Sequence, residues 1–300
     1  MQRVVGSTRY ATAAKLSAAN VEVGTERVYL ATGQGYADAL AAGAAAGSRD
    51  GPVLLAARHV LPQATAAELA RIAPQEVVVV GGEQVLSEAV ATAAGHAAQA
   101  PVIRRAGASR FSTAASLAET ATAQVVYLAT GEEFADALAG VPAAVAENAP
   151  MLLTGQDVLP QPTRDALTRL SPQRVVMLGG PQALSEQVRQ RVHGAVPGAS
   201  VQRLAGDDRF ATAATIAETV FGGQVVDDAV VATGGTFADA LAAGPVAGAS
   251  QSPLLLVGRD AVPAATEGAL RRLAPSQSLL LGGLGAVSDG VAGSLADILQ

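Results

Sequence analysis

The stretch that decides the fold is residues 31–40, ATGQGYADAL, in which a short apolar run passes through glycines into a helical pattern. It returns as ATGEEFADAL at residues 129–138 and as ATGGTFADAL at residues 232–241. Each copy reads Ala-Thr-Gly-x-x-aromatic-Ala-Asp-Ala-Leu. The aspartates Asp38, Asp136 and Asp239 lie 98 and 103 residues apart, which indicates a repeat of about 100 residues.

Two further motifs recur at similar intervals. Gly-x-x-Arg-aromatic-x-Thr-Ala precedes each copy and begins at Gly6, Gly107 and Gly206. A Gly-Gly pair follows each copy, at 81–82, 179–180 and 282–283, and leads to Ser87, Ser185 and Ser288, each followed by an acidic residue. Three motifs in one order at matching intervals predict three tandem units. We expect their boundaries at 1–99, 100–198 and 199–300.

Within one copy, short apolar runs alternate with helical patterns. Strands are predicted over 28–31, 53–56, 77–80 and 102–105. Helices are predicted over 36–47, 63–73, 87–94 and 110–120, with prolines flanking the second of them. The strands lack polar alternation, which favours burial on both faces in a parallel sheet. The sequence therefore predicts an α/β fold of three doubly wound units with mostly parallel sheets.

The composition narrows the class of partner. Half of the residues are hydrophobic, only 15% are charged, and the net charge is −6. This balance argues against general nucleic-acid binding, which needs a basic face. Almost all basic residues are arginine, so a local pocket for an anionic group stays open. No apolar run approaches a membrane span, so we expect no membrane insertion.

The first residues and the absence of cysteine bear on where the protein is located in or outside the cell. The first sixteen residues contain no apolar core of a signal peptide, which fits either a cytoplasmic protein or an excised part of a secreted one. There is no cysteine, which excludes disulfides and thiolate chemistry and leaves the redox compartment open.

The recurring polar residues are the candidate ligand-binding site. If the strands are parallel, all three motifs lie at the carboxyl ends of strands, the edge at which open α/β sheets bind ligands. Glycines there permit tight backbone, and helix N-termini offer free N–H groups. The candidates are Arg9, Arg110, Arg209, Thr32, Thr130, Thr233, Gly33, Gly131, Gly234, Asp38, Asp136 and Asp239.

Each candidate also has a structural interpretation. The threonines would cap backbone groups at the turn, and the aspartates would favour the positive end of a helix dipole. The arginines would pair with those aspartates or with a neighbouring copy. Ser87, Ser185 and Ser288 are predicted helix N-caps rather than nucleophiles. The aromatic residues of the repeat, Tyr36, Phe134 and Phe237, are interpreted as core residues rather than sugar-stacking platforms.

The sequence contains no complete catalytic motif. The three histidines occupy no shared repeat position, so no copy has a matched Ser-His-Asp set. No HExxH, Walker A or metal-ligand spacing occurs, and the glycines at 33, 35, 81 and 82 give only fragments of a dinucleotide loop. A threefold repeat favours multivalent binding over a single catalytic site. We therefore expect no enzyme, no cofactor and no metal.

At these residues the chain resembles the cell-wall-binding repeat 2 family, whose members carry three such units. The resemblance covers essentially the whole chain through the ordered pattern Arg-x-x-Gly, Arg-aromatic-x-Thr-Ala, Ala-Thr-Gly-x-x-aromatic-Ala-Asp-Ala-Leu and Gly-Gly-x-x-x-apolar-Ser. It implies Rossmann-like or Toprim-like units in a compact pseudo-trimer. One departure is Thr154 of the middle copy, which is replaced by Ala56 and Val257 in the others.

The resemblance also implies a function. It is that of a non-catalytic module that anchors a surface or secreted protein outside the cell, by non-covalent binding of an anionic wall polymer. That polymer would be teichoic-acid-like or a secondary wall polysaccharide of a Gram-positive-type wall. Two alternatives stay open: a surface-layer (S-layer) or spacer element that acts through its interfaces, and, less favoured, a Rossmann-like enzyme that uses a nucleotide.

Overall fold

Strands and helices alternate along the described residues and build three parallel sheets of four strands each. The computed structural model describes residues 1–47 and 51–300. The first sheet has the order β3 (Val53–Ala56), β2 (Arg27–Thr32), β4 (Glu76–Val80) and β5 (Val102–Arg105). The other two sheets repeat this order, and every strand pairing is parallel. The predicted α/β class with parallel sheets is therefore confirmed.

The second sheet contains β7 (Met151–Thr154), β6 (Val125–Thr130), β8 (Arg174–Leu178) and β9 (Ser200–Leu204), and the third β11 (Leu254–Val257), β10 (Asp228–Thr233), β12 (Gln277–Leu281) and β1 (Gln2–Val4). The helices are α1 (Arg9–Asn20), α2 (Ala37–Gly47), α3 (Gln63–Ile72), α4 (Glu88–Ala98), α5 (Arg110–Leu117), α6 (Ala135–Ala146), α7 (Gln161–Leu170), α8 (Glu186–Ala195), α9 (Arg209–Phe221), α10 (Ala243–Ala249), α11 (Ala264–Leu273) and α12 (Asp289–Ile298). Among the described residues, no helix has the length and apolar character needed to cross a bilayer.

Two predicted helices have different ends in the structure. The helix expected over 87–94 begins at Glu88 and continues through Gly95 to Ala98, where the left-handed Gln99 ends it. The helix expected over 110–120 ends at Leu117. There the guanidinium of Arg169 donates to the carbonyls of residues 118 and 119, at 2.8 and 2.9 Å. This arginine satisfies two carbonyls that follow the last helical residue.

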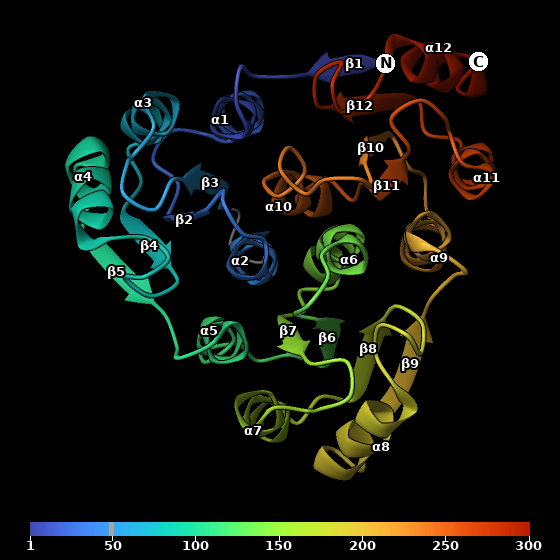
Figure 1. Cartoon of the computed structure of the whole chain (residues 1–300), viewed down its shortest axis with the longest axis horizontal. Coiled ribbons are helices and arrows are strands. Elements are labelled where there is room, and N and C mark those ends of the chain that lie inside the picture. The colour runs from blue at the N-terminus through green and yellow to red at the C-terminus, as the bar shows by residue number, and fades with distance from the viewer. Residues whose placement is uncertain (48–50) are drawn as a thin grey trace.

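The strand that opens each sequence repeat lies in the sheet of the preceding unit. β5 pairs with β4, and β9 pairs with β8. The N-terminal strand β1 pairs with β12 of the last unit, which brings the two termini together (Figure 1). The helix after each opening strand packs on the following unit, as α5 does on β7 and α7. Strand pairing thus joins the units into a closed ring.

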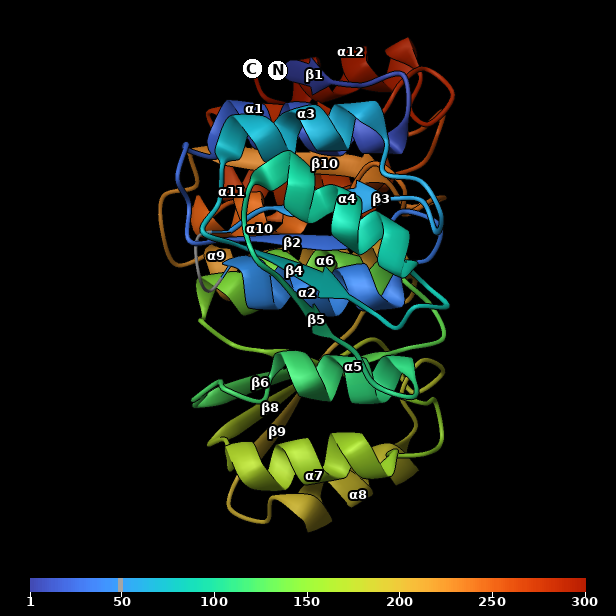
Figure 2. The ribbon, with the colours of Figure 1, turned by 90° about the vertical axis from the view of Figure 1, so that its left-hand side faces the viewer.

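Helices α2, α6 and α10 occupy the middle of the ring, where each contacts the other two (Figure 1). Seen from the side, α1, α2, α3, α5 and α7 run in nearly the same direction, and α4 is inclined to them (Figure 2). Helices α4, α8 and α12 lie at the periphery, outside their sheets. One apolar cluster fills the centre and continues into the third unit, and two smaller clusters fill the outer sides of the first two units. The compact pseudo-trimer is therefore confirmed.

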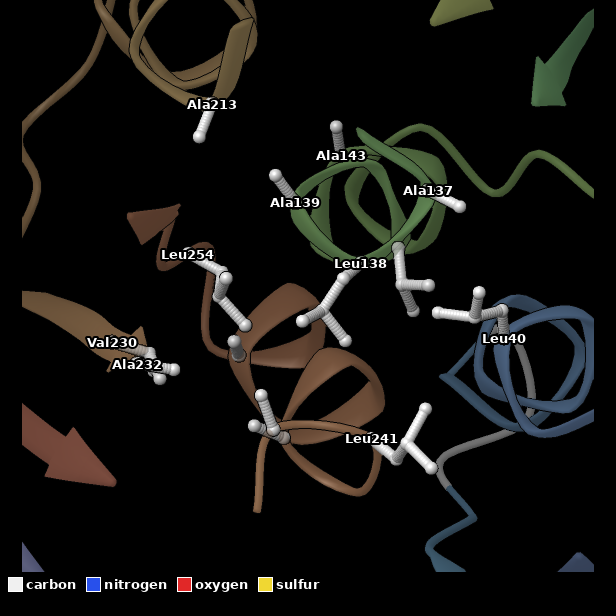
Figure 3. Packing of buried hydrophobic residues seen from close by; sticks show 14 of the residues in the cluster. Leu40, Ala137, Leu138, Ala139, Ala143, Ala213, Val230, Ala232, Leu241 and Leu254 are labelled. Carbon is white, nitrogen blue, oxygen red and sulfur yellow. The ribbon is translucent and has the colours of Figure 1, made fainter. Parts of the chain in front are cut away.

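Equivalent positions of the central helices meet near the pseudo-threefold axis in layers. One layer holds Leu40, Leu138 and Leu241, which are buried and lie close together in Figure 3. The next layers have a single bulky residue each, namely Val141 and Val145 of α6. The other two helices place glycine at these positions: Gly43 and Gly47 in α2, and Gly244 and Gly248 in the α10 segment.

The glycines are needed because the axis has room for one side chain in each of the two valine layers. A Cβ atom on Gly43 would lie 2.9 Å from Val141, and one on Gly244 would lie 2.4 Å from it. In the next layer, Cβ atoms on Gly47 and Gly248 would lie 2.3 and 2.4 Å from Val145. These separations are far shorter than van der Waals contact. The three units therefore share one fold, but their residues differ on the axis, where one unit has valine and the other two have glycine.

This packing predicts that the valine of a layer can be moved to another helix, but that a second valine cannot be added to the same layer. Gly244→Val should lower the free energy of unfolding by about 3 kcal/mol, because overpacking a close-packed core typically costs about 1–3 kcal/mol. The pair Gly244→Val with Val141→Gly should recover most of that loss, as measured by urea unfolding. Gly293→Val in α12, where a Cβ meets nothing within 4 Å, is the matched control. No recovery in the double variant would contradict the single-occupancy axis.

Candidate functional site

The recurring motifs meet in clefts between neighbouring units. In the first cleft, of about 660 Å³, the Thr32–Asp38 and Gly82–Val85 segments of unit one face residues 107–110 and Thr113 at the start of unit two. A second cleft, of about 420 Å³, has the equivalent lining from units two and three. The expectation that the motifs converge at the carboxyl edge of the sheets is confirmed. Each cleft combines the motifs of two consecutive units.

The threonines of the Thr-Gly motif hold the turn at the cleft floor. In Thr32, Thr130 and Thr233 the hydroxyl accepts the backbone N–H two residues on, at 3.1 Å in each unit. All three side chains are buried. Their capping of the strand-to-loop turn is therefore confirmed, and Thr32 and Thr130 also line the two clefts.

The glycines of the same motif permit a close approach by the preceding helix. A Cβ on Gly33, Gly131 or Gly234 would lie 2.7–2.9 Å from the ring of Tyr10, Phe111 or Phe210 respectively. Each of these rings belongs to the residue after the recurring arginine. A side chain at the glycine would push the arginine helix off the turn. The recurrence of these glycines is thus explained by packing.

The recurring arginines bond to backbone carbonyls and stack on rings. Arg9 Nη1 donates to Gly33 O at 2.6 Å, Arg209 Nη1 donates to Gly234 O at 2.7 Å, and Arg110 donates in the same way to Gly131 O. The guanidinium of Arg9 lies 5.9 Å from the ring centre of Phe237, and that of Arg209 lies 5.8 Å from Phe134. Each of these rings belongs to the preceding unit around the ring.

The expected pairing of these arginines with aspartate is not seen as direct contact. Within the described part of the chain, the ion pairs within 4 Å are formed by other arginines, such as Arg27, Arg71 and Arg174. Arg110 is exposed, and Arg9 and Arg209 are half-buried. A guanidinium has five N–H donors, and the glycine carbonyl takes only one or two of them. Donors without a carboxylate partner therefore remain at the cleft.

The aromatic residues of the repeat gather at one end of the axis. The ring centres of Tyr36, Phe134 and Phe237 are 5.6–5.8 Å apart, in tilted or edge-on arrangement. All three are half-buried against the central cluster, as expected for core residues. The Tyr36 hydroxyl also donates to Glu132 O of the next unit at 2.5 Å.

The aspartates reach across the unit boundary. Thr12 Oγ1 donates to Asp239 at 2.9 Å and accepts the N–H of Gly6 at 3.1 Å. Thr212 donates to Asp136 in the equivalent position. The first glycine of each Gly-Gly pair has a φ of about +100° and lies against the aspartate. A Cβ on Gly179 would lie 2.3 Å from Asp136 Oδ2. The Gly-Gly pair therefore makes room for this contact.

Burial changes the ionisation of two aspartates. It raises the pKa of Asp38, and the nearby Arg110 guanidinium partly offsets that rise. Burial, together with the negative charge of Glu133, raises the pKa of Asp136 to about 6, against the lowering effects of Arg209 and Thr212. These carboxyl groups are enclosed inter-unit contacts rather than solvated helix-dipole residues.

A second recurring arginine was not among the candidates. Arg3, Arg104 and Arg203 stand in the opening strands and clamp the Gly-Gly loop of the preceding unit. Arg104 donates to Gly81 O and Leu86 O at 2.9 and 3.0 Å and pairs with Glu88 at 3.0 Å. The signal was the Arg-x-x-Gly start of each repeat, whose role appears only once the opening strand is paired with the preceding sheet.

The serines after the Gly-Gly loop are at helix N-cap positions, as expected. The Ser185 hydroxyl accepts the N–H of Val188 at 3.4 Å. Ser87 and Ser288 form no such side-chain bond, and the buried Ser87 hydroxyl has no partner among the described residues. Hydroxyl capping is therefore confirmed only in the middle unit. Within the described residues, no cluster of histidine and acidic groups suits a metal ion.

The raised pKa of Asp136 predicts a pH-dependent stability. Between its ordinary pKa of 3.8 and about 6, the folded chain keeps a proton that the unfolded chain has released, so stability falls as pH rises through this window. Asp136→Asn removes this titration. The unfolding free energy of the variant minus that of the parent chain should therefore rise by about 1–3 kcal/mol from pH 4 to pH 7.

The measurement is denaturant unfolding at both pH values, with Asp165→Asn on the outer helix α7 as a control for the lost charge. A carboxyl of Asp136 that titrates at or below 3.8 by carbon-13 NMR would contradict the burial argument.

Two curated proteins are similar in sequence to about two thirds of this chain. The N-acetylmuramoyl-L-alanine amidase LytC of Bacillus subtilis (strain 168) is 30% identical over 192 residues, which is 63% of this chain. The amidase enhancer of the same organism is 33% identical over 192 residues, again 63% of this chain. The matches span 38% and 25% of the lengths of these two relatives.

Solved structures share the whole architecture. Cwp6 from Clostridium difficile matches 100% of this chain and 48% of its own, with a TM-score of 0.90 and 26% identity. Cwp8 from the same organism matches 99% of this chain and 51% of its own, with a TM-score of 0.88 and 23% identity, a likeness of fold.

The family comparison covers all three units. Cell wall binding domain 2 (CWB2) matches residues 3–91, 104–189 and 203–292. These segments contain the Arg, Thr-Gly-Asp and Gly-Gly-Ser motifs in every unit. The chain therefore belongs to the cell wall binding domain 2 family.

Proposed function

We propose that this chain anchors a surface or secreted protein outside the cell by binding an anionic wall polymer in the clefts between its units. The observation that carries the proposal is the recurring arginine that lines each cleft, Arg110 or Arg209, whose guanidinium forms no ion pair within 4 Å among the described residues. Family membership makes the chain a cell-wall-binding module and implies a cell wall or cell surface location. The polymer, its charge and the site are the proposed part.

Arginine suits a polymer of phosphate or carboxylate groups. Its planar fork binds either group in bidentate geometry. At Arg110 and Arg209, the glycine carbonyl fixes the guanidinium and leaves its other donors at the cleft. Such a preorganised cation loses less side-chain entropy on binding than a free one. The negative net charge of the whole chain is compatible with this, because the charge that matters is local.

Repetition strengthens such a site. A polymer carries many copies of the same anionic group, so a second cleft can bind the same chain at high effective concentration. Weak individual clefts therefore give firm attachment together. We propose that the module performs no catalysis of its own and that each sequence unit, 1–99, 100–198 and 199–300, supplies one side of two clefts.

The spacer alternative requires an apolar contact face. Within the described chain, the exposed large apolar side chains are Met1, Val5, Val23, Val60, Val158, Val225 and Leu284, which belong to the N-terminal segment and to loops of all three units. Binding through the clefts is the better supported function.

The proposal predicts sedimentation of the chain with purified Gram-positive walls and loss of that binding once the anionic polymer is removed by mild acid. Binding should also weaken steeply with salt, because Arg–anion contacts are screened. Equal binding to bare peptidoglycan would contradict the polymer claim.

A triple substitution of the recurring arginines Arg9, Arg110 and Arg209 by glutamine should lower wall binding more than tenfold. The matched control replaces the exposed Arg164, Arg189 and Arg271 of the outer helices by glutamine, which removes the same charge. Unfolding midpoints of both variants show whether the fold is kept. Equal binding by a folded triple variant and its control would exclude these arginines as ligand contacts.

A further inference from the structure

The three unit boundaries share one geometry but differ in charge. At each boundary the serine after the Gly-Gly loop donates its N–H to the carbonyl of the same loop residue. That residue is Arg58 in unit one, Gln156 in unit two and Arg259 in unit three, at 2.8–2.9 Å. These three residues therefore occupy equivalent places. The three units share the recurring motifs, and they differ in the charged residues that surround those motifs.

The cleft between units one and two is balanced in charge. Its lining contains Arg58 and Arg110 together with Asp38 and Glu83. Arg58 Nη2 donates to the neutral amide oxygen of Gln84 at 2.6 Å, so its charge is not neutralised there. Asp38 lies at the enclosed floor of the cleft, where burial raises its pKa. An anion at the mouth therefore meets the two guanidinium groups of Arg58 and Arg110 and one exposed carboxylate, that of Glu83.

The cleft between units two and three is acidic. One guanidinium, that of Arg209, stands among five carboxylates. These are Glu132, Glu133, Asp136, Asp207 and Asp208. The neutral Gln156 stands where the other units have arginine. Asp208 accepts the N–H of residue 211 at 2.8 Å as a helix cap, which holds its charge at the cleft. Like charges at about 4 Å repel by about 1 kcal/mol even in water, and by more in a partly enclosed cleft.

The boundary between units three and one is the most basic. Units three and one are in contact there through the Thr12–Asp239 bond. The equivalent positions hold Arg9 and Arg259 but only one carboxylate, that of Asp239. Where the acidic cleft has Asp207 and Asp208, this boundary has Ser7 and Thr8. Arg259 is exposed in the loop after β11.

We infer that the anionic polymer is bound at two of the three boundaries, one–two and three–one, with Arg58 and Arg259 as additional contacts, and that the two–three cleft excludes it. This inference rests on the proposed function and specifies which of its sites are active. The two–three boundary keeps its recurring arginine for the contacts that join the units, namely the Gly234 carbonyl and the Phe134 ring.

The test uses a synthetic tetramer of glycerol phosphate, which is short enough to report single clefts, and isothermal titration of the full chain. About two binding sites per chain are expected. Arg58→Gln and Arg259→Gln, which copy the residue of unit two, should each remove one site or weaken it at least fivefold. Arg164→Gln on α7 is the control for lost charge and should change nothing.

The matched set Arg9→Gln, Arg110→Gln and Arg209→Gln makes one chemical change at each boundary. The first two should weaken tetramer binding and the third should not, with unfolding midpoints measured alongside. Because Arg9 and Arg209 have the same structural contacts, a loss of fold would affect both alike.

A gain of function completes the test. Gln156→Arg combined with Asp207→Ser and Glu133→Thr gives the acidic cleft three of the residues of the basic boundary, removes two of its five carboxylates and should add a site. Equal losses in all three arginine variants, or three sites in the parent chain, would overturn the inference while leaving the proposed function intact. Failure of the parent chain to bind the tetramer while still binding walls would overturn both the phosphate chemistry and the inference.

Discussion

Space on the pseudo-threefold axis is the constraint on which the rest of the structure depends. Three nearly identical helices approach so closely there that each of two layers holds a single valine, opposite glycines. Helices α2, α6 and α10 carry these layers, and the recurring aspartates lie in the first turns of α2 and α6 and in the turn before α10. Because the axis fixes the helices, it also fixes where each aspartate meets the next unit. The clefts between the units follow from this packing on the axis.

The residues of the repeat hold the units together and line the clefts at the same time. Arg209 bonds to a carbonyl of its own unit and stacks on a ring of the preceding one. Thr12 joins its own Gly6 to Asp239 across the boundary. A structural and a binding role need not compete, because a guanidinium has more donors than these contacts use. Recurrence alone therefore does not separate the two roles, whereas the differences between units do.

Much of the fold could be predicted from sequence because the repeat supplies an internal comparison. The apolar runs at 28–31, 53–56 and 77–80 gave strands with ends within one residue of those found. The pairing of the opening strand with the preceding sheet could not be predicted, since a periodic sequence is equally consistent with either neighbour. The carbonyls that follow α5 bond to Arg169, which is distant in sequence, so no local pattern indicates this contact. The contacts of Arg104 with the Gly-Gly loop could not be predicted either, because they depend on the pairing of the opening strand with the preceding sheet.

The central claim is that an anionic polymer lies in the clefts between units, and its most direct test is a crystal structure of the chain with a short fragment of purified wall polymer. The account predicts anionic groups of the fragment within hydrogen-bond distance of Arg110 and Arg58, between the Thr-Gly turn and the Gly-Gly loop. A fragment bound on the outer helices α4, α8 or α12, with the clefts empty, would contradict it.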